Sequence, residues 1–209
     1  MNKGRQGFVH SWLQMIFGRS GGPMRETALP PVIQAAKQLP GRNEAIAYAA
    51  KLSGLVIDQP EAVAFYQAAF AKWPDPSFSN QDFRKQGDLL DKAALNALGL
   101  RANVKLSAQF LATLNEGGRA DPLGAASVIG STISTALCTC RHVGDMEASG
   151  IDLAKFHASN MATGPCSAAA KLDGQSIPVS GAPMLPFETC QHPGQCACFY
   201  QAWLAGLDD

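Results

Sequence analysis

The feature that most constrains this chain is a cysteine-rich loop near its C-terminus, PFETCQHPGQCACFYQAWL. It places Cys190, His192, Cys196 and Cys198 close together in a chain that has six cysteines and four histidines. Zinc prefers thiolate and imidazole ligands, and ligands a few residues apart in a turn can reach one ion. A Pro-Gly pair between His192 and Cys196 favours a sharp turn. The loop therefore predicts a metal site.

A fifth candidate ligand, Cys166, follows a Gly-Pro pair in a loop expected on the other side of a C-terminal sheet. It could complete a tetrahedron and join the two loops. A tetrahedral zinc site has four ligand positions, and we rank four cysteines first for them: Cys166, Cys190, Cys196 and Cys198. His192 is the competing ligand, because the spacing does not decide between the five residues. A set of candidate ligands so rich in sulfur predicts a structural zinc site with all coordination positions filled by the protein. A catalytic zinc instead keeps one coordination position open. The alternative is a group of metal-free thiols beside a surface histidine.

A second group of candidate ligands occurs in LCTCRH, which contains Cys138, Cys140 and His142. In a helix, Cys138 and His142 lie four residues apart on one face, a spacing that can chelate a metal. Cys140 instead continues an apolar stripe that includes Ile133 and Val143. Because free cysteine is so often buried, we favour packing for this group and predict a core thiol at Cys140.

The pattern of apolar residues changes near residue 150. Before it the period is helical, and after it short alternating segments stand between turns. The prediction is an α+β protein with a mostly α-helical N-terminal two-thirds, followed by a small antiparallel β module stapled by the Cys/His site. The expected parts are an amphipathic helix (1–18), a linker (19–30), a helical domain (31–148) and the β module (149–209). A module this short buries few apolar side chains, so a metal would add stability.

Capping residues suggest where the earlier helices begin. Asn43 would cap a helix over EAIAYAAKLSGLVI, and Asp58 with Pro60 would open the next over PEAVAFYQAAFAKW. Ser79 and Asp82 resemble a capping box, which predicts a helix through FRKQGDLLDKAALNAL.

Two further caps predict the later helices. Ser107 would cap AQFLATLNEG. Asp121 and Pro122 form an N-cap and first-turn pair that would open a long helix reaching about Met146.

The C-terminal segments read as strands and turns. DLAKFHAS sets Leu153, Lys155 and His157 against small or apolar neighbours and predicts a short strand. LDGQSIPV predicts a tight turn leading into a strand, and ACFYQAWL predicts the last strand. GAPMLPFE is too rich in proline for either regular element.

Charge limits the possible partners. Lys plus Arg equals Asp plus Glu at 17 each, so the formal net charge is zero. A neutral chain without a dense basic run lacks the electrostatic footprint of a general nucleic-acid binder. Weak self-repulsion favours association, so we expect a protein partner or a homo-oligomer.

The N-terminal segment bears on location. Residues 7–17 predict an amphipathic helix with Phe8, Trp12, Met15 and Ile16 on one face, interrupted by polar residues and too short to span a membrane. No membrane span is expected. We therefore assume a cytoplasmic, reducing location, where clustered cysteines are more often metal ligands than disulfides.

From about Ala136 to Leu204 the chain resembles the C-terminal module of phage minor head (head-morphogenesis) proteins. The resemblance lies in MEASGID, KFHAS, GPCSAAAKLDGQSIPV and APMLPFETCQHPGQCACFY. In that family a CxxC pair precedes a Leu-Asp-Gly turn, and a later Cys/His loop ends in an aromatic strand. The resemblance implies that Cys166 is the first ligand and that Cys190, His192, Cys196 and Cys198 supply the rest. Ala169 stands where the family has its second cysteine, which leaves that ligand's place to His192 or Cys198.

The sequence favours a non-enzymatic protein-interaction protein that is stapled by zinc and uses its helical region as the partner surface. The resemblance adds a possible relationship to phage head-morphogenesis proteins. If that relationship holds, the protein would be virion-associated. No catalytic residue is predicted. The alternative is a cysteine- or metal-dependent enzyme of unknown substrate. Its most testable trio is Cys166 as nucleophile with His157 and Asp173, although a strand and a turn already explain the last two.

Overall fold

The computed structural model describes residues 39–74, 79, 81–159 and 164–204. In these ranges the chain is mostly helical as far as Ala148 and ends in a small antiparallel sheet, so the predicted α+β class is confirmed. The predicted helix over 1–18 and the linker over 19–30 lie outside the described residues. The α-helices are α3 (Arg42–Leu52), α4 (Pro60–Ala69), α5 (Lys92–Ala97), α6 (Ala108–Ala112), α7 (Glu116–Ala120), α8 (Pro122–Ala148) and α9 (Ser167–Leu172). The 3-10 turns and strands are η1 (Phe70–Lys72), η2 (Asp82–Lys85), η3 (Val179–Gly181), η4 (Pro193–Gln195), β1 (Leu153–His157), β2 (Ser176–Pro178) and β3 (Phe199–Ala202).

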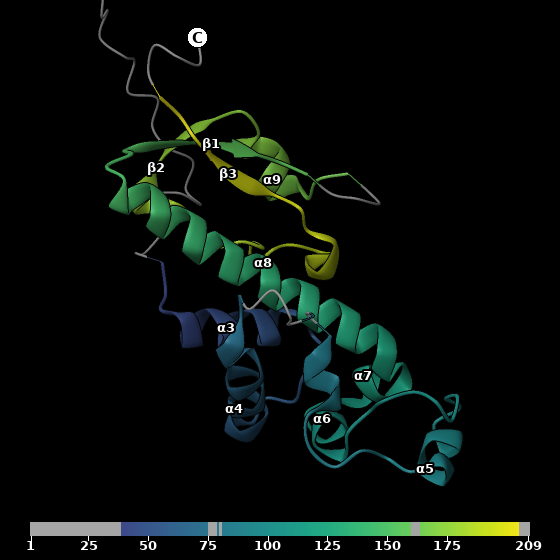
Figure 1. Cartoon of the computed structure of the whole chain (residues 1–209). Coiled ribbons are helices and arrows are strands. Elements are labelled where there is room, and N and C mark those ends of the chain that lie inside the picture. Colours follow the sequence, from purple (N-terminus) through teal and green to yellow (C-terminus); the bar gives the residue numbers. More distant parts are fainter. Residues whose placement is uncertain (1–38, 75–78, 80, 160–163, 205–209) are drawn as a thin grey trace, which may run out of the picture. The chain divides into compact units, whose positions relative to one another are not determined.

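The long helix α8 organises the described structure. It begins as predicted: the Asp121 carboxylate accepts a hydrogen bond from the backbone N–H of Gly124 at 3.0 Å, and Pro122 occupies the first turn. It lies between the layer of shorter helices and the sheet (Figure 1), and it contacts α3 and α7 as well as η4 and β3. A single helix therefore supports both parts of the fold.

By length and composition α8 would also be apolar enough to cross a membrane. Half of its most apolar stretch is buried within the described structure. A core helix of this kind passes the same test, because it too must be apolar over much of its surface.

The predicted helix over EAIAYAAKLSGLVI is too long. The N-cap of α3 is Gly41 rather than Asn43, and the N–H of Gly41 donates to the Glu44 carboxylate at 2.9 Å. The helix ends at Leu52, because Gly54 adopts a positive φ of 69° that side-chain-bearing residues avoid. Val56 already forms an isolated β-bridge with Leu114.

The helix predicted through FRKQGDLLDKAALNAL is wrong as a single element. The N–H of Ser79 does donate to Asp82 at 2.8 Å, but this contact opens only the short turn η2. Gly87 then takes a φ of 101° and ends the helical path. The helix α5 starts afresh at Asp91, whose carboxylate accepts from the N–H of Ala94 at 2.8 Å.

The two remaining caps differ in outcome. Ser107 caps α6 as predicted, accepting from the N–H of Phe110 at 3.1 Å, although α6 ends early, at Ala112. Gln59, not Asp58, is the N-cap of α4, with Pro60 in the first turn as expected.

The core among the helices centres on four aromatic rings. Phe83 contacts Tyr66, Phe70 and Phe110 with ring centroids 5.4 to 5.5 Å apart. All four side chains are fully buried. The Tyr66 hydroxyl shares a buried hydrogen bond of 2.7 Å with the Thr113 hydroxyl, which satisfies the polar end of that ring.

The three-stranded sheet has the order β2-β1-β3, with both pairs antiparallel. The predicted strands are confirmed in position, and β1 alternates as expected, with Ala154 and Phe156 buried. A second aromatic group packs beneath the sheet, where Phe156 contacts both Phe187 and Tyr200. The Tyr200 hydroxyl donates to the carbonyl of Pro183 at 2.8 Å, so the proline-rich segment closes this core.

The central position of Phe83 predicts a large effect of its truncation. Phe83→Ala should lower the free energy of unfolding by about 3–5 kcal/mol, because it leaves a cavity among three aromatic rings. Urea denaturation measures the change. Leu89, about half exposed, is the control: Leu89→Ala should change stability by no more than about 0.5 kcal/mol. Similar losses for both variants would contradict the aromatic core described above.

Candidate metal centre

The four first-ranked cysteines come from three separate segments. Cys166 is the N-cap residue of α9. Cys190 ends the proline-rich segment, and its N–H donates to the carbonyl of Phe187 at 2.9 Å. Cys196 follows the turn η4 and Cys198 precedes β3. Cys198 is buried and the other three are partly buried.

Pairwise interactions join these thiols in one series. The thiol of Cys190 interacts with those of Cys166 and Cys196, and the thiol of Cys196 interacts with that of Cys198. Residues 32 positions apart in the chain are thereby connected through their sulfur atoms. We call Cys166, Cys190, Cys196 and Cys198 the thiol series.

The thiol series is more open than a finished metal site. Within the described residues, no three Cys, His, Asp or Glu side chains converge closely enough to hold a metal ion. The donor types suit zinc, which accepts four thiolates.

Burial and mutual contact perturb the acidities within the row. Desolvation raises the pKa of Cys190. The hydrogen-bonding interaction with Cys198 raises the pKa of Cys196, and burial adds to the effect. The same interaction lowers the pKa of Cys198 to about 7, because Cys196 stabilises its thiolate as a donor. Without a metal, Cys190 and Cys196 therefore keep their protons at neutral pH.

The backbone of Ser159, two residues after the end of β1, also contacts Cys198. Its sulfur lies 3.5 Å from the backbone nitrogen and 3.4 Å from the carbonyl oxygen of Ser159. The thiol can donate to the carbonyl, and the thiolate can accept from the N–H. The end of β1 thus holds this sulfur in either protonation state.

The cysteine loop packs closely on α8. A Cβ added to Gly194 would lie 2.9 Å from both Cα and Cγ1 of Val128, so a side chain does not fit there. The Thr135 hydroxyl donates a hydrogen bond to the carbonyl oxygen of Cys196 at 3.4 Å. From α3, the Tyr48 hydroxyl donates to the carbonyl of Pro186 at 2.6 Å, just before the loop. These contacts fix the loop on the helical part of the protein.

His192 lies at the edge of this arrangement. Its side chain is exposed, and it is the N-cap residue of η4. Its backbone interacts with the sulfur of Cys190 through a hydrogen bond. Among the contacts of the described residues, its imidazole ring does not reach a thiol. A ligand role for this ring stays a prediction.

The second cysteine group divides as the sequence suggested for Cys140. This residue packs against the helical core and is partly buried, with its sulfur 3.6 Å from the carbonyl oxygen of Pro40. Burial raises the pKa of its thiol. Cys138 and His142 instead face a hollow of about 230 Å³ that Cys196 and Cys198 also line. The sequence showed that Cys138 and His142 share a helix face, but it did not show that this face lies opposite Cys196 and Cys198. The packing of α8 against β3 is a tertiary contact, which the sequence pattern does not reveal.

The trio considered for enzymatic catalysis is not assembled. The Asp173 carboxylate accepts from the N–H of Ala158 at 2.8 Å, which supports the turn before β2. The His157 ring stacks on Phe199 with centroids 4.9 Å apart, and its Nε2 is buried without a partner among the described residues. In the same part of the chain, no hydrogen bond joins Cys166 to either side chain. A nucleophile, base and orienting acid need such contacts.

No family model matches this chain, and no curated protein or solved structure matches it either.

The close contact between Gly194 and Val128 predicts that a methyl group at this position destabilises the protein. Gly194→Ala should lower the free energy of unfolding by about 1–3 kcal/mol, because the turn must move away from α8. Gly181→Ala is the matched control, since it lies in the other C-terminal 3-10 turn with no neighbour within 4 Å of an added Cβ. It should stay within about 0.5 kcal/mol of the parent. Urea denaturation of both variants measures the difference, and equal stabilities would argue against this docking of η4.

Proposed function

We propose that this chain is a non-enzymatic protein-interaction protein whose C-terminal module is held together by a structural zinc ion. One observation carries the proposal: four cysteines from three segments form a continuous series of interacting thiols. Thiols that pack only as small apolar groups have no reason to gather from distant segments. Soft thiolate ligands select zinc among the common structural metals.

The small sheet has a physical need for such a cross-link. Its strands have five, three and four residues, and the segment between β2 and β3 is rich in proline. Short strands with few paired backbone groups gain little stability from pairing alone. A zinc ion held by Cys166, Cys190, Cys196 and Cys198, with His192 as the competing ligand, would tie α9, η4 and β3 together.

The composition of the site supports a structural rather than a catalytic role. Four sulfur ligands would close the coordination sphere and leave no position for a substrate or an activated water. Among the described residues, the hydrogen-bond partners of Cys190, Cys196 and Cys198 are other thiols and backbone groups rather than a histidine or a carboxylate. A cytoplasmic location suits the site, because thiols there stay reduced and available to a metal.

The proposed interaction role is broader than one biological setting. A role in phage head morphogenesis, and hence a virion-associated location, rests on the sequence resemblance alone. A protein partner or self-association is favoured by the zero net charge. General nucleic-acid binding is disfavoured on the same ground.

Metal content provides the first test. Protein purified without chelator should contain about one zinc per chain by elemental analysis, and Cys190→Ser should lose most of it, because Cys190 touches two other thiols of the series. Cys138→Ser is the matched control, since Cys138 is exposed and outside the series. It should retain the parent zinc content. Metal-free parent protein, or equal zinc in both variants, would contradict the proposed site.

Proton release provides a second test. The pKa values of Cys190 and Cys196 are raised above the ordinary 9.0, so both thiols are protonated in metal-free protein at pH 7.5. Zinc binds thiolates, so each binding event should release at least about two protons. Cys198, with a pKa of about 7, adds little. Calorimetric titration in buffers of different ionisation enthalpy counts these protons. Release of fewer than about one would exclude ligation by both cysteines.

A further inference from the structure

Cys166 and Cys190 form the first pair of the thiol series. They lie 24 positions apart in the chain, and their side chains interact through a hydrogen bond. Both thiols are partly exposed, so a small solute can reach them. The sulfur of Cys190 is also bonded to the backbone of His192, and Cys166 is held at the start of α9. Two oxidisable sulfur atoms are therefore held near each other where the solvent has access.

The other two thiols of the series interact mainly with each other. The hydrogen bond with Cys198 raises the pKa of Cys196 more than any other contact does, including that with Cys190. The pKa of Cys190, in turn, responds more to Cys166 than to Cys196. The series thus divides into two pairs, Cys166 with Cys190 and Cys196 with Cys198.

The two pairs differ in how well they suit a disulfide bond, which needs Cα atoms about 4.4–6.8 Å apart. One residue separates Cys196 from Cys198, and the backbone at Cys196 is extended, with φ −65° and ψ 123°. Two residues along an extended chain span roughly 6.6 Å, at the upper end of that range. The Cys198 sulfur is also buried against both backbone groups of Ser159. The longer chain between Cys166 and Cys190 imposes no such limit, so this pair is the better candidate.

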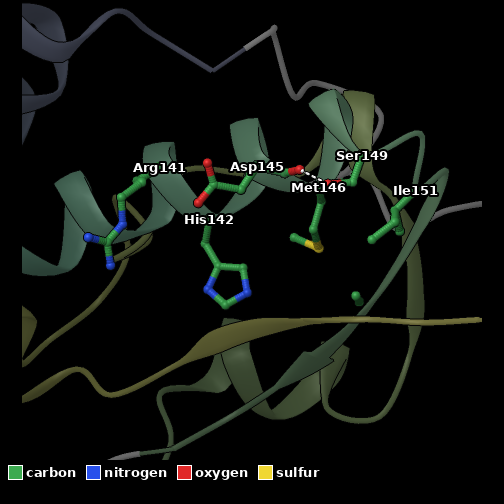
Figure 2. A pocket seen from close by; sticks show the side chains of 7 residues that line it. Arg141, His142, Asp145, Met146, Ser149 and Ile151 are labelled. Carbon is green, nitrogen blue, oxygen red and sulfur yellow. Dashed lines mark hydrogen bonds between the residues drawn. The ribbon is translucent and has the colours of Figure 1, made fainter.

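A thiol outside the series, Cys138, lies in a different environment. It is exposed on α8, where it and His142 line the hollow of about 230 Å³. Figure 2 shows the His142 ring extending from α8 on the side of β3. Cys166 and Cys190 are not among the residues that line this hollow. Cys138 is therefore a suitable control for the reactivity of that pair.

We propose that Cys166 and Cys190 are a site of oxidation, which a peroxide converts into a disulfide when no zinc occupies the thiol series. One sulfur attacks a peroxide oxygen and becomes a sulfenic acid, while the O–O bond breaks and the other oxygen leaves with the thiol proton as water or an alcohol. The second sulfur then attacks the first. The S–S bond forms, the S–O bond breaks, and the hydroxyl group leaves as water with the second thiol proton. Two electrons pass from the sulfur atoms to the peroxide.

The disulfide would join segments that the proposed zinc also joins. Cys166 begins α9 and Cys190 ends the proline-rich segment, so the bond closes a loop that contains α9 and β2. Closing a loop restricts the unfolded chain and so favours the folded one. The module would then stay cross-linked when an oxidant displaces the metal. The competition with zinc rests on the proposed function, whereas disulfide formation in metal-free protein does not depend on it.

Mapping of the oxidised cysteines tests the proposal. The full chain is freed of metal with a chelator and treated with hydrogen peroxide, and the remaining thiols are alkylated in denaturant. The expected product has one disulfide per chain, and tandem mass spectrometry of proteolytic fragments should locate it between Cys166 and Cys190. Another bond as the main product, a bond between two chains, oxidation to sulfinic acid or a fully alkylated chain would overturn the proposal.

Two variants and a denatured sample provide the controls. Cys166→Ser should abolish this disulfide, whereas Cys138→Ser should form it at the parent rate. Circular dichroism reports whether each variant is folded, and the map of the parent chain carries the test if Cys166→Ser is not. The parent oxidised in denaturant should give a mixture of bonds, because the folded structure no longer selects the pair. The same mixture from folded and denatured protein would overturn the proposal.

Zinc distinguishes this inference from the proposed function. Zinc at about nine times its Kd should slow disulfide formation about tenfold, because only the metal-free chains present both thiols. An equal rate with and without zinc would contradict the zinc site and leave the oxidation site. Zinc binding by a protein that forms no disulfide when metal-free would do the reverse.

Discussion

Helix α8 buries side chains against two different parts of the protein, and the remaining structure depends on this double role. Its earlier residues, such as Ile129 and Ile133, belong to the aromatic core formed with α3, α4 and α6. Its later buried residues, Val143 and Met146, lie outside that cluster, where the helix approaches β3. A sheet this small has one face to cover and little apolar area of its own. A continuous helix supplies that cover at no additional ordering cost, because the other core already fixes it.

The thiol series depends on the same arrangement. Contacts of η4 with Val128 and Thr135 place Cys196 beside α8, and the end of β1 holds Cys198. The thiols are thus brought near one another; desolvation keeps Cys190 protonated, and the hydrogen-bonding interaction with Cys198, together with burial, keeps Cys196 protonated. The proposed zinc would replace those protons. Partly buried thiols, whose desolvation is unfavourable, would then become a cross-link.

Sequence reasoning succeeded where a local interaction decides the outcome. The side chains of Asp121 and Ser107 accept hydrogen bonds from N–H groups three residues away, so their helix starts were predictable. The alternation of β1 reflects one buried face, which the sequence displays directly. It failed at Gly54 and Gly87, where a positive φ ends a helix although the apolar pattern continues. The short helix α9 was missed, because six residues are too few to show a period.

The sequence by itself determined the fold class, the main strands and the list of candidate ligands, because these depend on residue type and on contacts within a few positions. Only the tertiary structure decided that Cys166 meets Cys190, that Cys138 and His142 face the cysteine loop, and that β1 lies between β2 and β3 in the sheet. These relations join residues far apart in the chain. They follow from which surfaces α8 buries and from the order of strands in the sheet, and neither leaves a periodic signal in the sequence.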